Sequence, residues 1–185
     1  MATYILSQVC VFIAFAIDAT SYFFKTKKNF LLLCICYSCF YILSYIFLNV
    51  YLAVIANSIF LVRNIWYTHL NNKNKKFNAY LLPIFILNAG FITAFIFLYT
   101  SYLDLFLLFS VLLLTIVFAF RNMLIIRIAA VFNGIVWAIY NFIIKGYVNF
   151  ACNIFMIIII SSTIFLHHIY PKIKQKKIEQ TQSSK

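Results

Sequence analysis

Long apolar runs, separated by short polar segments, fill almost the whole chain. About 20 apolar residues in a helix cross a bilayer, because the hydrocarbon core is about 30 Å thick and each residue adds about 1.5 Å. A strand of a membrane barrel would instead alternate apolar and polar side chains. The pattern therefore predicts an all-α membrane protein with seven transmembrane helices. They are expected at residues 4–24, 30–48, 50–67, 78–99, 103–120, 122–144 and 147–169.

The basic residues gather after the first, third, fifth and seventh runs. Cytoplasmic loops of membrane proteins carry an excess of Lys and Arg, so these segments are expected on the cytoplasmic side. That assignment puts the N-terminus outside and the C-terminus in the cytoplasm, and it leaves Lys145 alone outside. The cytoplasmic residues would be Lys25, Lys27, Lys28, Lys73, Lys75, Lys76, Arg121, Lys172, Lys174, Lys176, Lys177 and Lys185.

The composition agrees with a membrane protein. The 185 residues are 65% apolar and only 10% charged, whereas a soluble domain is about half apolar and about a quarter charged. The formal charge of +12 does not indicate nucleic-acid binding, because the basic residues lie in loops between apolar runs rather than along one polar face. We therefore expect membrane lipids, and no nucleic acid, as partners.

Little in the sequence points to catalysis. The five cysteines match no metal-binding spacing, and Cys34, Cys36 and Cys39 lie inside one apolar run. With only three acidic residues, the chain has few groups for acid–base chemistry. We expect no enzyme activity, no metal and no cofactor.

The order of the runs suggests two similar halves. Three helices reverse the direction of the chain and a fourth returns it, so the last three runs would have the same orientation as the first three, as in a parallel repeat. Residues 1–70 and 102–170 would be three-helix bundles, joined by a basic loop and connector helix at 71–101, with a basic tail at 171–185. Lys28-Asn29 matches Arg121-Asn122 at an offset of 93, and Tyr51 with Asn57 matches Tyr147 with Asn153 at 96. The three-residue difference is expected in the outer hairpin.

Four polar or amphipathic side chains are candidates for a solute site. Asn57 and Asn153 each lie about 10 Å below the expected outer surface, and Trp137 lies at a similar depth, with Asn133 a weaker candidate. Amide groups can both donate to and accept from a hydroxyl-rich ligand, and an indole offers a flat face. The alternative is that each amide only bonds a neighbouring helix, as polar residues in membranes often do.

Asp18 is the only acid well inside an apolar run, and an ionisable group there suggests a function. Arg63 lies at a similar depth in the third run and is its expected partner, in an intramembrane ion pair or gate. The alternatives are a protonated, hydrogen-bonded Asp18 and an Arg63 that reaches the inner interface near Tyr67.

An ordered set of residues resembles the YgjV family of bacterial inner-membrane proteins over nearly the whole chain. The set is Gln8, Ala14-Phe15, Phe23-Phe24, Tyr51, Arg63-Asn64, Trp137 and Tyr140-Asn141-Phe142. That family is thought to be distantly similar to the SWEET sugar facilitators and the PnuC transporters. The resemblance implies the bacterial inner membrane, a 3+1+3 fold and passage of a small solute.

In SWEET proteins the third helix of each bundle supplies an Asn to the sugar site, and the middle helix of the second bundle supplies a Trp. Asn57, Asn153 and Trp137 resemble that set in helix and depth. SWEET proteins use prolines in several helices as hinges. The chain departs from them, because it has no proline in runs 1, 2, 5 or 6 and no PQ dipeptide. The resemblance therefore does not extend to these hinges. Related transporters often form homo-oligomers.

The leading interpretation is a small-solute facilitator that opens alternately by rocking of two three-helix bundles. The alternative is a non-transporting scaffold, receptor or immunity-type protein, which the low Gly and Pro content fits equally well. The basic tail could then hold anionic lipid or an acidic partner.

Overall fold

The computed structural model describes residues 2–99, 101–143 and 145–171, and within them it contains seven α-helices and no strand. Each predicted helix is present, within a few residues of the expected bounds. The predicted basic tail lies outside the described residues, apart from Pro171. The helices are α1 (Ala2–Ser21), α2 (Lys27–Phe47), α3 (Tyr51–Asn72), α4 (Asn78–Leu98), α5 (Leu103–Val117), α6 (Met123–Ile143) and α7 (Tyr147–Ile164), which continues as a π-helical turn at Phe165–Ile169.

Five of the described helices are long and apolar enough to cross a membrane: α1, α2, α4, α6 and α7 with its π turn. Helix α5 is apolar but has only 15 residues. Helix α3 is long enough but more polar, because it carries Asn57, Arg63 and Asn64, all of which are buried against other helices. A helix that is covered by its neighbours does not need an apolar surface all round.

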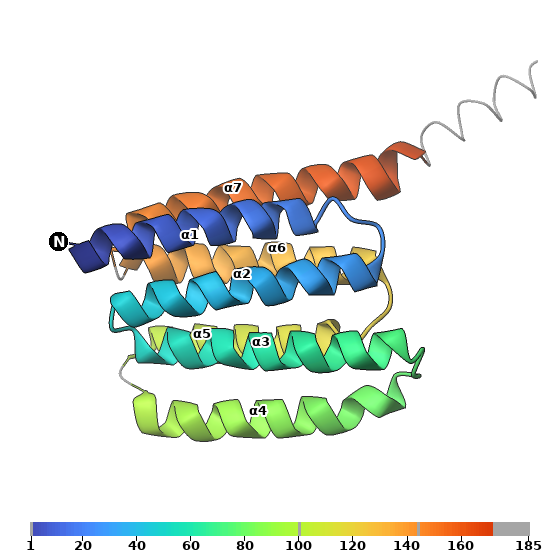
Figure 1. Cartoon of the computed structure of the whole chain (residues 1–185), viewed down its shortest axis with the longest axis horizontal. Helices are drawn as coiled ribbons and strands as arrows, with labels where there is room; N and C mark the ends of the chain where they lie inside the picture. The colour runs from blue at the N-terminus through green and yellow to red at the C-terminus, as the bar shows by residue number, and fades with distance from the viewer. Residues whose placement is uncertain (1, 100, 144, 172–185) are drawn as a thin grey trace, which may run out of the picture.

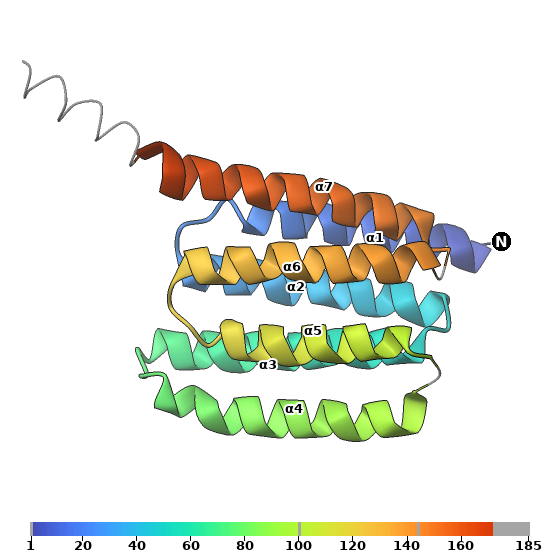
Figure 2. The ribbon, with the colours of Figure 1, turned by 180° about the vertical axis from the view of Figure 1, so that it is seen from behind.

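The helices lie side by side along one axis, and successive helices run in opposite directions (Figures 1 and 2). Helix α2 packs between α1 and α3, and α6 packs between α5 and α7. The two groups form layers that face each other, with α1 against α7 and α3 against α5. Helix α4 lies at the edge, where it contacts both α3 and α5.

The turns after α2 and α6 have the same backbone structure. Asn49 and Lys145 both adopt the left-handed conformation, with φ of 58° and 60°. In the first turn, the N–H of Asn49 donates to the carbonyl of Ile46, and that of Val50 to the carbonyl of Tyr45. In the second turn, the N–H of Lys145 donates to the carbonyl of Phe142, and that of Gly146 to the carbonyl of Asn141. Each member of the second turn lies 96 residues after its counterpart in the first.

This register corrects one sequence match. Helix α2 begins at Lys27 and α6 at Met123, which again gives an offset of 96. The match of Lys28-Asn29 with Arg121-Asn122, at 93, is therefore wrong as a structural correspondence, and the outer hairpins contain no three-residue insertion. Asn and Lys are so frequent in this chain that two adjacent matches arise without structural meaning.

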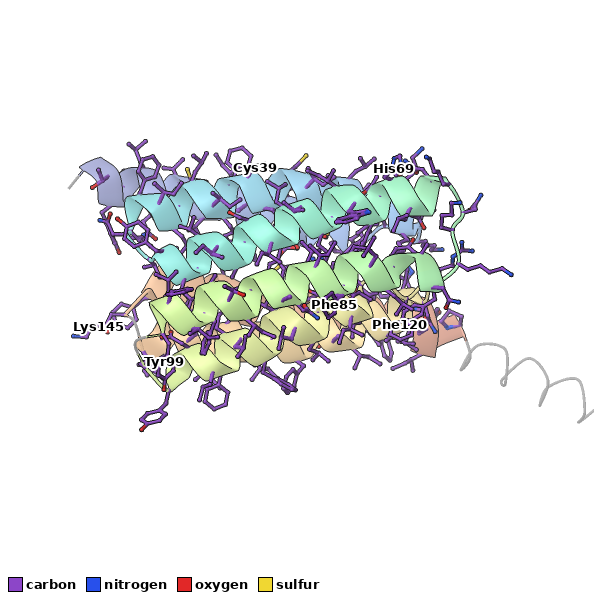
Figure 3. The ribbon with its side chains drawn as sticks, turned by 90° about the horizontal axis from the view of Figure 1, so that it is seen from below. Cys39, His69, Phe85, Tyr99, Phe120 and Lys145 are labelled. Atoms are coloured by element: carbon purple, nitrogen blue, oxygen red, sulfur yellow. The ribbon has the colours of Figure 1, made fainter. Side chains whose placement is uncertain are left out.

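The two ends of the helices differ in charge. Figure 3 shows Lys145 and Tyr99 at one end, and His69 and Phe120 at the other. The loops after α1, α3 and α5 meet at the second end, which we call the lysine-rich end, and the first we call the Lys145 end. The described basic residues in those three loops and at the start of α2 are Lys25, Lys27, Lys28, Lys73, Lys75, Lys76 and Arg121.

The outer surface between the two ends is apolar. Phe85 on α4 and Phe97 near its end are 74% and 81% exposed. Large exposed apolar side chains such as these are expected where lipid, rather than water, surrounds the protein.

Candidate functional site

A cavity of about 70 Å³ lies between the two layers, and every candidate site residue from the sequence lines it. Asp18 comes from α1, Asn57 and Arg63 from α3, Asn133 and Trp137 from α6, and Asn153 from α7. The other lining residues are Tyr22, Tyr37, Tyr41, Phe60, Leu114 and Phe118. The structure therefore brings together all six polar and aromatic residues that the sequence singled out.

The polar lining distinguishes this cavity from the larger grooves on the outside of the protein. A groove along α1, of about 430 Å³, and one between α6 and α7, of about 540 Å³, have walls that are almost wholly apolar. Such grooves suit lipid chains. The cavity between the layers is much smaller than the roughly 300 to 1,000 Å³ of most ligand pockets.

The cavity is lined by equivalent positions of the two layers. Five lining residues belong to the second half of the chain, from α5 to α7. Each lies 96 residues after a lining residue of the first half, from α1 to α3. The pairs are Asp18 with Leu114, Tyr22 with Phe118, Tyr37 with Asn133, Tyr41 with Trp137, and Asn57 with Asn153. This is the same register as in the outer turns, so the cavity lies where corresponding faces of the two layers meet.

Asn57 and Asn153 make the same local hydrogen bond. The Nδ2 of Asn57 donates to the carbonyl of Ala53, and the Nδ2 of Asn153 donates to that of Asn149, each at 2.8 Å. These bonds stay within the helix rather than crossing to a neighbour. Each amide therefore keeps its oxygen and one N–H for another partner.

Asn133 behaves differently. Its Oδ1 accepts a short hydrogen bond from the hydroxyl of Ser110 on α5. Asn133 therefore bonds a neighbouring helix, which is the packing role given above as the alternative. Asn57 and Asn153 instead bond carbonyls of their own helices.

Asp18 and Arg63 share the cavity but do not form a salt bridge. Arg63 is only 1% exposed, and its Nε and Nη2 donate to the Oδ1 of Asn64 at 3.1 and 2.9 Å. Its guanidinium lies between the rings of Phe118 and Phe60, 3.9 and 4.6 Å from their centroids. The Nη1 of Arg63 and the Oδ1 of Asp18 are buried and have no hydrogen-bond partner among the described residues.

A cluster of aromatic rings lies next to the cavity, on the side of the Lys145 end. The indole of Trp137 lies 5.9 Å from the ring of Tyr45 and 5.8 Å from that of Tyr140. Tyr45 follows Tyr41 by one helical turn, and the two rings stack at 6.5 Å. Because Tyr45 comes from α2 and Trp137 from α6, this cluster joins the two layers.

Basic side chains close the lysine-rich end in a reciprocal arrangement. The Nζ of Lys27, at the start of α2, donates to the carbonyls of Ala119 and Phe120 after α5, at 3.3 and 2.9 Å. The Nη2 of Arg127, on α6, donates to the carbonyls of Tyr22 and Phe24 after α1, at 2.9 and 3.3 Å. We call these four contacts the basic clasp.

The basic clasp gives hydrogen-bond donors to backbone carbonyls of the segments that directly follow α1 and α5. It is reinforced by the hydroxyl of Tyr67, which donates to the carbonyl of Thr115 at 2.7 Å and so joins α3 to α5. From the sequence, Lys27 is expected only as a cytoplasmic charge, and Arg127 lies a turn or two inside the sixth apolar run with no assigned partner. Their partners are backbone carbonyls more than ninety residues away, which no side-chain pattern reveals.

The family model of the Imp-YgjV family, described as a bacterial inner membrane protein, matches residues 5–169 of the chain. No curated protein and no solved structure matches it. Because the match covers most of the sequence, the chain belongs to the Imp-YgjV family. It is therefore a multi-pass protein of the bacterial inner membrane, in agreement with its membrane-length helices.

Proposed function

We propose that this inner-membrane protein is a facilitator or transporter of a small solute, and that the cavity between the two layers is its solute site in a closed state. The observation that carries the proposal is the cavity itself: it is polar inside an apolar protein, and equivalent positions of two helix layers line it. A site between two matching halves is the usual arrangement in transporters built from repeats.

The proposed architecture is a 3+1+3 parallel repeat in which all seven helices cross the membrane. Residues 1–70 and 102–170 are the two bundles, and 71–101 contain the connector α4. The offset of 96 in the outer turns and in the cavity lining supports the repeat. The basic residues at one end favour a cytoplasmic lysine-rich end, with the N-terminus outside and the C-terminus inside.

In this proposal Asn57, Asn153 and Trp137 contact the solute. The two amides offer matching donors and acceptors from opposite layers, and the indole supplies a flat apolar face. Asn133 contributes to the wall through its bond to Ser110. A solute that fills the cavity would replace the unmade hydrogen bonds of these groups, which are costly to leave unmade inside a membrane.

The two closures act as alternate gates. Separation of Tyr45 from Trp137 would open the cavity to the outside, and release of the basic clasp would open it to the cytoplasm. Both closures join one bundle to the other, so rocking of the bundles about the cavity can open one while the other stays closed. The 3+1+3 rocking motion does not need a proline hinge within a helix, because each bundle moves as a body.

Solute binding tests the site. Thermal unfolding of the detergent-purified chain would be followed against a panel of sugars, nucleosides, vitamin precursors and amino acids. A solute that binds only the folded state raises the unfolding temperature, with stabilisation of about 2.7 kcal/mol at a hundredfold excess over its dissociation constant. We expect at least one solute to stabilise the wild type and to lose this effect in Asn57→Ala and Asn153→Ala.

Asn141→Ala is the matched control. Asn141 is buried in α6, and its Nδ2 donates to the carbonyl of Trp137 at 2.8 Å, the same local bond as in the two site residues. It does not line the cavity. The control should therefore lose similar stability but keep the solute response. A response that survives both site substitutions would remove Asn57 and Asn153 from the site, and the absence of any response would favour a scaffold or receptor.

A further inference from the structure

We propose that the cavity selects small zwitterionic solutes, with Arg63 receiving the acidic group and Asp18 the ammonium group. This inference rests on the proposed function and specifies the chemical class of the solute. The proposed function does not assign a contact with the solute to either of these two buried side chains.

The state of Arg63 points to an anionic ligand group. A guanidinium that is 99% buried needs several acceptors, yet among the described residues its only hydrogen-bond acceptor is the Oδ1 of Asn64. Its Nη1 is buried with no partner in the described part of the chain, and the Arg63 side chain is part of the cavity wall. The contacts to Phe118 and Phe60 hold the guanidinium plane in place and supply a favourable but weaker cation–π interaction. An acceptor that enters the cavity would complete the coordination of Arg63.

Asp18 points to a cationic ligand group. Its Oδ1 is buried without a partner in the described part of the chain, and its carboxyl faces the same cavity as the rings of Tyr37 and Tyr41. A carboxyl beside aromatic faces is suited to an ammonium group, which gains both an ionic hydrogen bond and cation–π attraction.

The two groups together favour a zwitterion over a simple ion. An ammonium group beside Asp18 favours the ionised carboxylate, whose charge then cancels that of Arg63, and a charge left unbalanced inside the membrane is costly. Because the two side chains do not pair directly, each is available to one end of a ligand that lies between them.

Four probes on one three-carbon skeleton test the inference: alanine as zwitterion, lactate as anion, alaninol as cation and propylene glycol as neutral diol. The measurement is the concentration of each probe that gives half-maximal thermal stabilisation of the full-length purified protein. One hydrogen bond to a charged group corresponds to about a tenfold change in affinity. We expect alanine to act at a concentration about tenfold lower than lactate or alaninol, and lower still than propylene glycol.

Two substitutions assign the charges separately. In Arg63→Gln, alanine should lose its advantage over alaninol but keep it over lactate, and in Asp18→Asn it should lose its advantage over lactate alone. Arg63→Lys, which keeps the charge without the planar guanidinium, is a second variant in case Arg63→Gln does not fold. Asn141→Ala should leave the order of the four probes unchanged.

The wild-type order alone can overturn the inference. If propylene glycol or a larger polyol stabilises the chain better than alanine, in a manner that needs Asn57 and Asn153, the solute is neutral: the inference fails and the proposed function stands. If no probe and no member of the broader panel stabilises the chain, both fail.

Discussion

Lys27 and Arg127 contact two carbonyls that occupy equivalent positions in the two helix layers. Lys27 donates to Phe120 and Arg127 donates to Phe24, and these acceptors lie 96 residues apart. The donors are not equivalent, because Arg127 lies one helical turn deeper than the position that corresponds to Lys27. Different residues at different depths therefore make equivalent contacts on the two sides of the interface.

The basic clasp predicts that its loss opens the lysine-rich end. In Lys27→Ala combined with Arg127→Ala, the four hydrogen bonds of the clasp are lost together with the contact of Arg127 Nη1 with His168 Nε2. Each hydrogen bond from a charged donor contributes about 1.5 to 3 kcal/mol in other proteins. Cys34, which is 0% exposed on α2, should then react several-fold faster with a maleimide in a chain whose other four cysteines are alanine.

Lys28→Ala is the matched control for this experiment, since Lys28 is exposed and neighbours Lys27. It should leave the labelling rate of Cys34 unchanged. If the double variant labels at the rate of the control, the clasp does not hold the inner end closed.

Trp137 provides an optical test of the opposite closure. The chain has two tryptophans, so Trp66→Phe leaves Trp137 as the only indole. Because Trp137 is 6% exposed and packed against Tyr45 and Tyr140, its emission should be shifted to short wavelength and weakly quenched by iodide. Tyr45→Ala should increase the quenching several-fold. Quenching that is strong in the parent, or that Tyr45→Ala does not change, would show that the rings do not cover the cavity.

The left-handed turns predict an unequal response to glycine. A non-glycine residue in this conformation costs about 1 to 2 kcal/mol, and Asn tolerates it better than Lys. Lys145→Gly should therefore raise the free energy of unfolding by about 1 kcal/mol, and Asn49→Gly should change it little. Thermal or denaturant unfolding in detergent measures both. Equal effects at the two sites, or destabilisation by Lys145→Gly, would contradict the assigned conformation.

Close packing of α6 on α7 depends on Gly134. A Cβ at this position would lie 3.0 Å from the Cγ1 of Ile157, so a small residue is needed where the two helices approach. Gly134→Leu should destabilise the protein by about 1 to 3 kcal/mol, as overpacking usually does, and Gly134→Ala by less. Ile135→Leu, on the exposed side of the same helix, is the control. A Gly134→Leu variant as stable as this control would argue against the observed contact.

Much of the fold could be predicted from the sequence, because membranes constrain sequences strongly. The length of each apolar run sets the length of each helix, and the basic loops mark one end of the molecule. The two helices that differ from a simple span, α3 and α5, are partly covered by other helices. Burial of Asn57, Arg63 and Asn64 against neighbours allows α3 to be more polar than hydropathy alone would permit.

The site could be predicted in part. Asn57, Asn153, Trp137, Asn133, Asp18 and Arg63 stand out because polar groups are rare inside apolar runs, and all six line the cavity. Tyr37 and Tyr41 do not stand out among 13 tyrosines. The offset of 96, applied to α2 and α6, would have found them, since Tyr41 corresponds to Trp137 and Tyr37 to Asn133. The direct pairing of Asp18 with Arg63 is absent because Asn64, the next residue in the chain, takes the guanidinium.

Solute flux through the purified protein distinguishes a transporter from a receptor. Proteoliposomes that contain the wild-type chain would be placed in iso-osmotic solutions of the panel solutes, and swelling would be followed by light scattering against empty liposomes and against Asn57→Ala with Asn153→Ala. We predict that at least one solute that stabilises the protein also enters the vesicles faster than in both controls. A solute that binds with the expected dependence on Asn57 and Asn153 but never crosses the membrane would contradict transport and leave a receptor in its place.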